Sequence, residues 1–252
     1  MAQPTTLMRP RTQWSEAEWK TRVDLAACYR LADLNHMSQV IWNHITARVP
    51  GTDEILINRL GLRFDEIRAS NLLKISIDGR VIDGEPDDLN FTGYVIHGAV
   101  HKARPDTACV MHRHSRGGQG VAAMKRGLLP LTQESMMFFE DVAYHSYEGL
   151  SLDESECGRL ARDLGDKKQM ILRNHGLLTV GHTVADAYWR MFYLERCCQA
   201  QMDVLATGEE LEVPPREVCL KAREQMTSGP VGRREWPALL RQLDKLCPDY
   251  KE

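Results

Sequence analysis

The chain contains 252 residues, 43% of them hydrophobic, which is enough to bury a sizeable core and favours one large domain over two small ones. With 32 Lys and Arg residues against 35 Asp and Glu, the formal net charge is -3, so no basic field exists to collect nucleic acid or anionic lipid. The expected partners are therefore small molecules and other proteins, with no nucleic acid and no membrane among them.

The N-terminal region predicts an arm followed by a helix. Residues 1–13 contain prolines and little hydrophobic periodicity, so we expect a mobile arm. Ser15-x-x-Glu18 is a capping box, and it opens a helix whose apolar positions repeat every 3.6 residues or so as far as Leu31. Because the chain has no apolar targeting or membrane-spanning run, and its cysteines have no C-x-x-C spacing, we expect a cytoplasmic protein with free thiols.

The sequence of the middle of the chain predicts several strands, followed by a helix and another strand. Between about residues 40 and 100, short apolar runs such as 55–57 and 73–77 are separated by Pro-Gly and Asp-Gly pairs, which indicates strands and hairpins. A helix is predicted over 93–103. The apolar run 108–111 that follows it is predicted to be a buried strand.

The second half continues the alternation. We expect a short helix over 118–125 and a further helix that is capped by Ser151 and ends near residue 163. The run 169–172 predicts a strand that ends at an Arg-Asn-His-Gly turn. The longest helix is predicted to begin at Thr183, with a buried apolar stripe.

Residues 209–252 predict a linker and a C-terminal amphipathic helix that packs on the body or on a neighbouring subunit. The apolar positions of this helix are Trp236, Leu239, Leu240, Leu243 and Leu246. Residues 14–208 are predicted to form a single domain. Strands interleaved with helices favour an α/β fold, a three-layer α/β/α sandwich whose central, largely antiparallel or mixed sheet is covered by helices on both faces.

Three histidines form a candidate metal site. Side chains alternate along a strand, so His112 and His114 point to the same face, and His175 ends a second predicted strand. If those strand ends lie side by side, three imidazoles converge with a fourth position open, which is the make-up of a catalytic zinc site; Mn, Fe or Co would also fit. In the alternative interpretation, the first two histidines hydrogen-bond to the backbone and the third occupies a turn.

Between roughly residues 20 and 207 the chain resembles the class II aldolase/adducin family. The resemblance is carried by seven segments in the family's order: Asn43–Arg48, Leu56–Gly61, His97–Pro105, Val110–His114, Gly127–Leu131, Val142–His145 and Leu172–Leu178. In the sugar-phosphate aldolases of this family an H-x-H pair and a later H-G histidine hold the metal, which implies the ligands His112, His114 and His175 here. The resemblance also implies a homotetramer with active sites at subunit boundaries, a role for which the C-terminal apolar stripe offers a contact surface.

The chain departs from those aldolases at positions that serve catalysis and phosphate binding. Their catalytic carboxylate precedes the first ligand histidine by about nineteen residues, and that position is Gly93 here. Their phosphate-binding serine pair matches Phe91 and Thr92, and of the other phosphate-binding positions Asn43 and Gly61 remain. We therefore expect a substrate without a phosphate group, with Asn43, Gly61 and Thr92 as substrate-binding candidates.

Other polar side chains are candidates to replace the missing carboxylate. Gln133 and Glu134 lie near the position of a catalytic tyrosine in those aldolases, so Gln133 is expected to bind substrate and Glu134 to transfer protons; alternatively, Glu134 is only the exposed first turn of a helix. Tyr147 is a second catalytic candidate, unless its ring is simply buried. His97 and His101 lie four apart on a predicted helix, a spacing that can also make a metal pair. We expect instead that the helix packs its His97 face on the sheet.

The leading hypothesis is a metal-dependent lyase, which uses aldol cleavage or decarboxylation through a metal-stabilised enediolate or carbanion. Its substrate would be a small hydroxylated or carboxylated molecule, and zinc is the first choice of divalent metal. Because the stretch from Gly127 to Gly149 resembles the adducin head, which is regarded as non-enzymatic, an adducin-like binding protein is the alternative. A third possibility is a non-haem metal oxygenase, since three neutral ligands also suit Fe(II).

Overall fold

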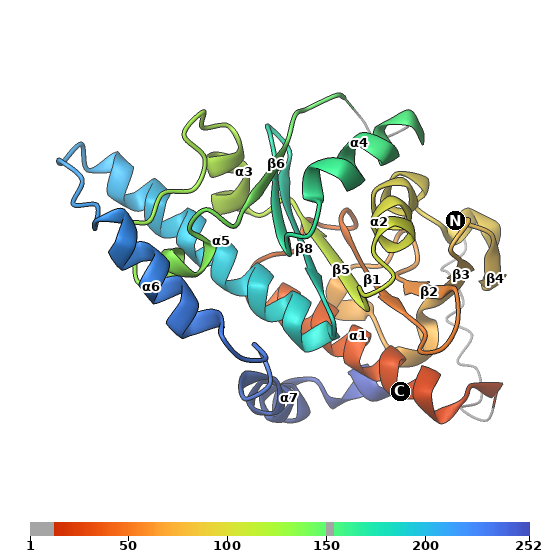
Figure 1. The fold of residues 1–252 in the computed structure, drawn as a ribbon. Coiled ribbons are helices and arrows are strands. Elements are labelled where there is room, and N and C mark those ends of the chain that lie inside the picture. Colours follow the sequence, from red (N-terminus) through yellow and green to blue (C-terminus); the bar gives the residue numbers. More distant parts are fainter. Residues whose placement is uncertain (1–12, 150–153) are drawn as a thin grey trace.

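The computed structural model describes residues 13–149 and 154–252, and within them the chain builds one eight-stranded sheet (Figure 1). The strands are β1 (His44–Arg48), β2 (Glu54–Ile57), β3 (Leu73–Ser76), β4 (Val81–Asp83), β5 (Cys109–Arg113), β6 (Ala143–His145), β7 (Gln169–Leu172) and β8 (Gly176–Gly181). Their order is β4-β3-β2-β1-β5-β8-β7-β6. The β6 and β7 pair is parallel and the other described pairs are antiparallel, so the predicted mixed sheet is confirmed.

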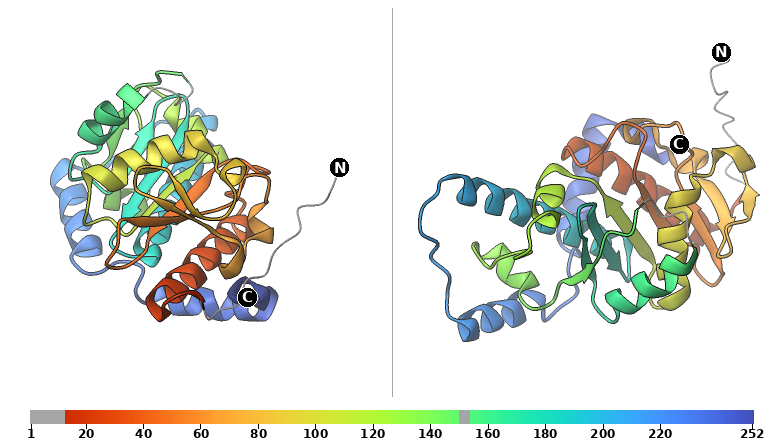
Figure 2. Two further views of the ribbon diagram at one scale, coloured as in Figure 1. Left: turned by 90° about the vertical axis from the view of Figure 1, so that its right-hand side faces the viewer. Right: turned by 90° about the horizontal axis from the view of Figure 1, so that it is seen from above.

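Helices cover both faces of this sheet, as the predicted sandwich requires (Figures 1 and 2). The α-helices are α1 (Glu16–Leu34), α2 (Phe91–Ala103), α3 (Arg116–Ala122), α4 (Glu154–Leu164), α5 (Val184–Ala206), α6 (Arg216–Thr227) and α7 (Glu235–Leu246). The short 3-10 helices are η2 (Phe64–Glu66), η3 (Ala69–Asn71), η4 (Pro86–Asp88), η5 (Glu134–Phe138) and η6 (Pro248–Lys251). One apolar core packs α1 and α5 on the sheet, and another packs α2 and α4 on the opposite face.

Local sequence signals fix several helix ends where they were predicted. The Ser15 hydroxyl accepts a hydrogen bond from the backbone N–H of Glu18 at 3.1 Å, and Thr183 caps α5 in the same way. The predicted cap Ser151 and the predicted arm, apart from residue 13, lie outside the described residues. None of the described helices is both long enough and apolar enough to cross a bilayer.

The strand that carries the H-x-H pair is longer than its apolar run predicts. The expected strand ends at residue 111, but β5 continues to Arg113. The reason is pairing on both sides, because His112 lies opposite His44 of β1 and opposite Leu178 of β8. Backbone hydrogen bonds to two neighbouring strands therefore hold the first candidate ligand rigidly within the sheet.

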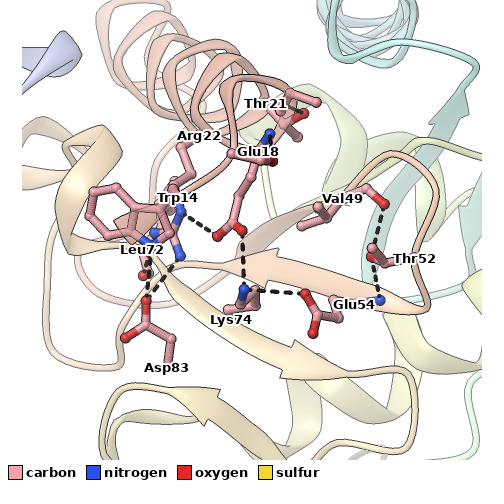
Figure 3. A network of polar contacts seen from close by, with 12 residues as sticks. Trp14, Glu18, Thr21, Arg22, Val49, Thr52, Glu54, Leu72, Lys74 and Asp83 are labelled. Carbon is pink, nitrogen blue, oxygen red and sulfur yellow. Dashed lines mark hydrogen bonds and ion pairs between the residues drawn. The ribbon is translucent and has the colours of Figure 1, made fainter. Parts of the chain in front are cut away.

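A buried ionic network ties the start of α1 to the strands at one edge of the sheet (Figure 3). Arg22 is fully buried and donates to Glu18 at 2.9 Å and to Asp83 at 3.2 Å, while Lys74 bridges Glu18 and the strand β2. The indole N–H of Trp14 donates to Asp83 at 3.2 Å. A buried guanidinium is tolerated when its donors are paired in this way, so the network fixes α1 on the sheet.

The C-terminal segment contains more structure than a linker and one helix. The helix α6 lies in the predicted linker, and α7 packs its apolar side on α1 and α5 of its own chain. Trp236 is 9% exposed and Leu243 is fully buried, whereas Leu246 is 61% exposed. The body of the same chain thus covers most of the apolar stripe, which leaves little of it to hold a neighbouring subunit.

Candidate metal centre

The structure brings the three predicted histidines together at one end of the sheet. His112 lies in β5, His114 follows that strand, and His175 occupies the tight turn between β7 and β8. The imidazole centroids of these residues are 4.6 to 4.8 Å apart, and one ring nitrogen of each lies within 4.8 Å of the others. Because β8 pairs with both β5 and β7, the sheet itself sets this arrangement.

The hydrogen bonds of two of these rings determine which nitrogen is free. Nδ1 of His112 lies 2.9 Å from the carbonyl oxygen of Leu177, which can only accept, so Nδ1 must donate. Nδ1 of His114 donates to Oε1 of Gln39, also at 2.9 Å. Both Nε2 atoms then present lone pairs, 3.0 Å apart. Two facing lone pairs cannot hydrogen-bond to each other, but a cation between them would satisfy both, so this donor set fits a divalent metal.

Burial keeps the three imidazoles neutral at neutral pH. It is the largest cause of the lowered pKa of all three rings, and that of His175 falls to about 4. The neighbouring imidazoles lower the pKa of His112 further, and the buried guanidinium of Arg113 does so for His114. Metal binding requires unprotonated imidazole, so protons compete less at this site than at an exposed histidine.

A buried amide stands beside the histidines. Asn43 adopts a positive φ of 75°, a conformation that asparagine tolerates better than most residues, and its Oδ1 accepts from the backbone N–H of His114 at 3.0 Å. The side chain is 4% exposed, and its Nδ2 has no hydrogen-bond partner among the described residues. A buried donor without a partner is costly, which points to an oxygen atom of a bound molecule.

Comparison with known proteins places this site in a family. A model of the class II aldolase and adducin N-terminal domain matches residues 23–202. The chain belongs to the class II aldolase and adducin family. The predicted resemblance is thereby confirmed.

Individual relatives include aldolase-like and adducin proteins. The chain is 44% identical over 248 residues to a Pseudomonas aeruginosa protein whose name places it in aldolase class 2, and the match covers 96% of each. It is 39% identical to mouse alpha-adducin, covering 92% of this chain but 34% of the adducin. Among solved structures it is similar to an aldolase II superfamily protein from Pseudomonas syringae (TM-score 0.92, 50% identity, 96% and 99% coverage of the two chains). It is also similar to an L-fuculose 1-phosphate aldolase from Glaciozyma antarctica (TM-score 0.84, 28% identity, 98% of each chain).

The other candidate residues of this class II aldolase family member fall into two groups. Tyr147 is 53% exposed, and its ring centroid lies 6.3 Å from that of His175. Gly61 follows β2, at the end of the sheet where β1 begins, and Thr92 lies in the first turn of α2. Of these three residues, Tyr147 has a ring contact with a candidate ligand, and the roles of Gly61 and Thr92 stay predictions.

Gln133 and Glu134 do not join the histidines within one chain. They lie at the start of η5, which packs on α5, whereas the His112 ring faces α2. Burial raises the pKa of Cys197 in α5 to about 12, and the Glu134 carboxylate also raises it. A role for Glu134 in proton transfer therefore requires a neighbouring subunit.

The imidazole of His44 stands where a side chain at position 93 would have to lie. A Cβ atom added to Gly93 would meet the His44 ring, with Cδ2 only 2.4 Å away. His44 is buried, lies opposite His112 in the strand register, and has its ring centroid 5.5 Å from that of His112. The space that a carboxylate side chain at this helix position would need is thus filled by an imidazole from strand β1.

His44 is the first member of a buried chain of histidines. Its Nδ1 lies 2.9 Å from Nε2 of His97, and Nδ1 of His97 lies 2.7 Å from the hydroxyl of Thr46. The same hydroxyl lies 2.9 Å from Nε2 of His101. The prediction that His97 packs on the sheet is correct, but sequence reasoning gave His44 no role. The available signal was its position next to Asn43, inside a segment that carries the resemblance.

A second imidazole is oriented on the same face of the sheet. Nδ1 of His145, at the end of β6, lies 2.8 Å from the Asp163 carboxylate of α4. His145 also contributes to the lowered pKa of His175, after burial and His114. The sequence did not predict this carboxylate partner, which comes from helix α4.

Replacement of Gly93 by alanine is expected to displace the His44 ring. The added methyl group overlaps that ring, so we expect a loss of about 1 to 3 kcal/mol of unfolding free energy, the usual cost of overpacking. Urea denaturation measures this loss. Gly158→Ala in α4 is the matched control, because a Cβ there meets nothing within 4 Å. Both positions lie in helices, so alanine gains helix propensity in each, and the two variants are compared with each other. If Gly93→Ala is as stable as Gly158→Ala, the His44 ring does not occupy the space assigned to it.

The buried histidine chain predicts a marked loss of stability in mild acid. Burial is the main cause that lowers the pKa of both His44 and His101 to about 3 in the folded protein, against about 6.5 when unfolded. Between these two pKa values the unfolded state binds more protons than the folded state. The free energy of unfolding therefore decreases as the pH is lowered, by about 1.4 kcal/mol per pH unit for each histidine. Urea midpoints of metal-free protein should drop steeply from about pH 6.5 downward. A constant midpoint down to about pH 5 would contradict the neutral burial of these rings.

Proposed function

We propose that this protein is a metal-dependent lyase that breaks a carbon–carbon bond, by aldol cleavage or decarboxylation, in a small hydroxylated or carboxylated substrate. The observation that carries the proposal is the pair of unprotonated Nε2 atoms of His112 and His114, 3.0 Å apart and completed by His175. A divalent cation held there, zinc in the first place and Mn, Fe or Co otherwise, would act as a Lewis acid that stabilises negative charge on substrate oxygen.

The surrounding side chains suit the binding and protonation of such a substrate. The unpartnered Nδ2 of Asn43 can donate to a substrate hydroxyl or carboxylate oxygen. The half-exposed Tyr147 has its ring close enough to His175 for its hydroxyl to reach the leaving fragment and transfer a proton. Gly61, Thr92 and Gln133 remain proposed binding positions.

We propose that the substrate lacks a phosphate group. A phosphate dianion needs several charged or hydrogen-bonding donors, and the matching positions here offer the Asn43 amide, the glycine Gly61 and the pair Phe91-Thr92. The Glaciozyma antarctica relative is named for a sugar phosphate, so this would separate the two proteins in substrate class.

Calorimetry with hydroxamates tests the proposed activity and the substrate class together. A hydroxamate chelates a divalent cation through two oxygens and imitates the charge distribution left when the carbon–carbon bond breaks. We expect glycolohydroxamate to bind zinc-loaded protein at least about tenfold more tightly than protein stripped by chelator, a difference of about 1.4 kcal/mol. Its phosphorylated counterpart should bind no better. A failure of both compounds to bind loaded protein would contradict the lyase.

An adducin-like binding protein is the second candidate function. It is favoured by the 39% identity to mouse alpha-adducin and by the absence of a carboxylate at Gly93. In that case the histidines would be a remnant of the fold, and the protein would be equally stable with and without zinc. Thermal unfolding of stripped and zinc-loaded protein distinguishes the two candidates, because a bound metal stabilises only the folded state.

We further propose a homotetramer with its sites at subunit boundaries. Val40 and Trp42 are 69% and 54% exposed and directly precede Asn43, so apolar side chains lie in water beside the site. A neighbouring subunit that covers them could also supply Glu134. Light scattering at micromolar concentration should give about four times the 28.7 kDa of one chain, and a mass near 28.7 kDa would refute the tetramer.

The cytoplasm is the compartment that we propose for this activity. All seven cysteines are free, and five of them are buried. A reducing compartment preserves such thiols, whereas secreted proteins commonly pair them in disulfides.

A further inference from the structure

A cavity with aromatic walls lies between α5 and α7, on the sheet face opposite to the one toward which the His112 ring points. Its volume is about 220 Å³, and the side chains that define its character are five aromatic rings and one carboxylate: Tyr188, Trp189, Phe192, Tyr193, Trp236 and Glu235. A cavity of this size suits a ligand much smaller than a drug molecule. None of these residues takes part in the histidine site or in its proposed chemistry.

The sequence of α5 creates the aromatic walls. Tyr188, Trp189, Phe192 and Tyr193 are spaced so that neighbouring turns of the helix present their rings on one side. The rings of Trp189 and Tyr193 meet at 54° and those of Phe192 and Tyr193 at 89°, whereas the rings of Tyr188 and Phe192 are stacked at 25°. The cavity is therefore lined by both ring edges and ring faces.

Helix α7 closes the cavity and brings the negative charge. Trp236 from this helix meets the Tyr188 ring at 57°, with 5.8 Å between the centroids. The preceding residue, Glu235, accepts a hydrogen bond from the indole N–H of Trp189 at 3.3 Å, which orients its carboxylate at the cavity wall. Burial and then Glu235 raise the pKa of the Tyr193 phenol, so the carboxylate acts on the cavity.

One ring of the cavity wall already lies near a cation. The guanidinium of Arg196 lies over the Phe192 ring, 5.7 Å from its centroid. Aromatic faces carry negative charge density, and several faces with a carboxylate attract a cation more strongly than one face alone. A primary ammonium group would lose most of its hydrogen bonds to water here, because the walls are largely apolar. An ammonium that bears methyl groups loses fewer and gains contact with the rings.

We propose that the cavity between α5 and α7 binds a small methylated ammonium cation, held by the rings of Tyr188, Trp189, Phe192, Tyr193 and Trp236 and by the Glu235 carboxylate. The cation could be a free metabolite or a methylated side chain of another protein. Binding would not depend on metal at the histidines, so the proposal stands apart from the proposed lyase function.

Two probes of equal shape test this proposal. Choline carries a trimethylammonium group, and 3,3-dimethylbutan-1-ol has a neutral carbon in place of the nitrogen. We expect choline to shift the indole N–H NMR signal of Trp189 in the full-length protein and to bind at least about tenfold more tightly than the alcohol. Equal binding of the two probes would show that the cavity is merely apolar and would overturn the proposal, as would no binding of either at about 10 mM.

Variants assign the contributions of charge and rings. Glu235→Gln keeps the side-chain shape, so it should weaken choline binding several-fold and leave the alcohol unaffected. Phe192→Leu removes one ring and should weaken choline more than the alcohol. The proposal is wrong if choline binding is unchanged in both variants while their unfolding midpoints match the wild type.

Two further experiments distinguish a methylated side chain of another protein from a second copy of this chain as the occupant of the cavity. A peptide that contains trimethyllysine, compared with the same peptide with unmodified lysine, reports a methylated side chain as ligand. Light scattering with and without choline reports occupation by another copy of this chain. If choline lowers the molecular mass, the cavity belongs to a subunit interface, and the proposed small-cation site is overturned.

Discussion

A His112→Ala/His114→Ala variant is expected to retain no stoichiometric divalent metal, whereas wild-type protein purified without a histidine tag should carry about one ion per chain. Two of the three proposed nitrogen ligands are lost, and one imidazole does not retain a divalent ion against dialysis. Elemental analysis by mass spectrometry after dialysis measures the metal content, and circular dichroism checks that the fold persists.

His182→Ala is the matched control for this experiment. His182 follows β8 and its side chain is 54% exposed, so its loss removes one histidine without touching the site. The control should keep the wild-type metal content and, if the lyase assignment holds, its metal-dependent hydroxamate binding. If the double variant keeps its ion while folded, the metal lies elsewhere and the proposed centre is wrong.

Glu195→Ala is expected to cause the largest loss of stability among single changes near the site. Glu195 is 3% exposed and accepts hydrogen bonds from the Ser115 hydroxyl and from the backbone N–H groups of Gly117 and Gly118, the latter two at 2.9 and 2.8 Å. Without the carboxylate these buried donors at the start of α3 lose their acceptor, each at a cost of about 1 to 3 kcal/mol. We expect a total loss of roughly 3 kcal/mol or more.

Urea denaturation measures this loss of unfolding free energy, provided that the dependence of that free energy on urea concentration has the same slope in the variant and the wild type. Glu224→Ala, an exposed residue of α6, is the control and should change stability by less than about 0.5 kcal/mol. Because Ser115 directly follows His114, Glu195→Ala should also weaken zinc affinity. A Glu195→Ala protein as stable as the control would show that the carboxylate does not hold the start of α3.

Elements with strong local signals were predictable from the sequence. The Ser15 capping box and the Thr183 cap define the starts of α1 and α5, and the turns around Gly51 and Gly79 separate the first strands. Alternation along one strand placed His112 and His114 on one face. Helix α6 was missed because it has little apolar periodicity, with Cys219 its one buried residue, and it is held by contacts to η5 and the turn after it.

The environment of the site was less predictable than the convergence of its three histidines. The sequence shows that no carboxylate stands at position 93, but the ring that fills this space comes from β1, and its partner His97 lies 53 residues further along the chain. Gln39, which orients His114, is 75 residues away from it and belongs to no motif. Such contacts depend on strand order and helix placement, which local patterns do not specify.

For Glu134, in contrast, the sequence suggested a place in the site that the fold of one chain does not give it. Its distance in sequence from the H-x-H pair is short, and the resemblance to the aldolases suggested a catalytic role. The fold places it beside Cys197 on the face that α5 covers, so a single chain cannot bring it to the histidines. The proposed proton transfer by Glu134 therefore depends on the proposed assembly.

The most direct test of the central claim is an anomalous diffraction measurement at the zinc edge, on crystals of untagged protein loaded with zinc. We predict one strong peak at about 2.0 to 2.1 Å from a ring nitrogen of each of His112, His114 and His175, with a fourth coordination position open to solvent or substrate. A map without a peak at these three residues, or with the zinc held by other side chains, would contradict the account.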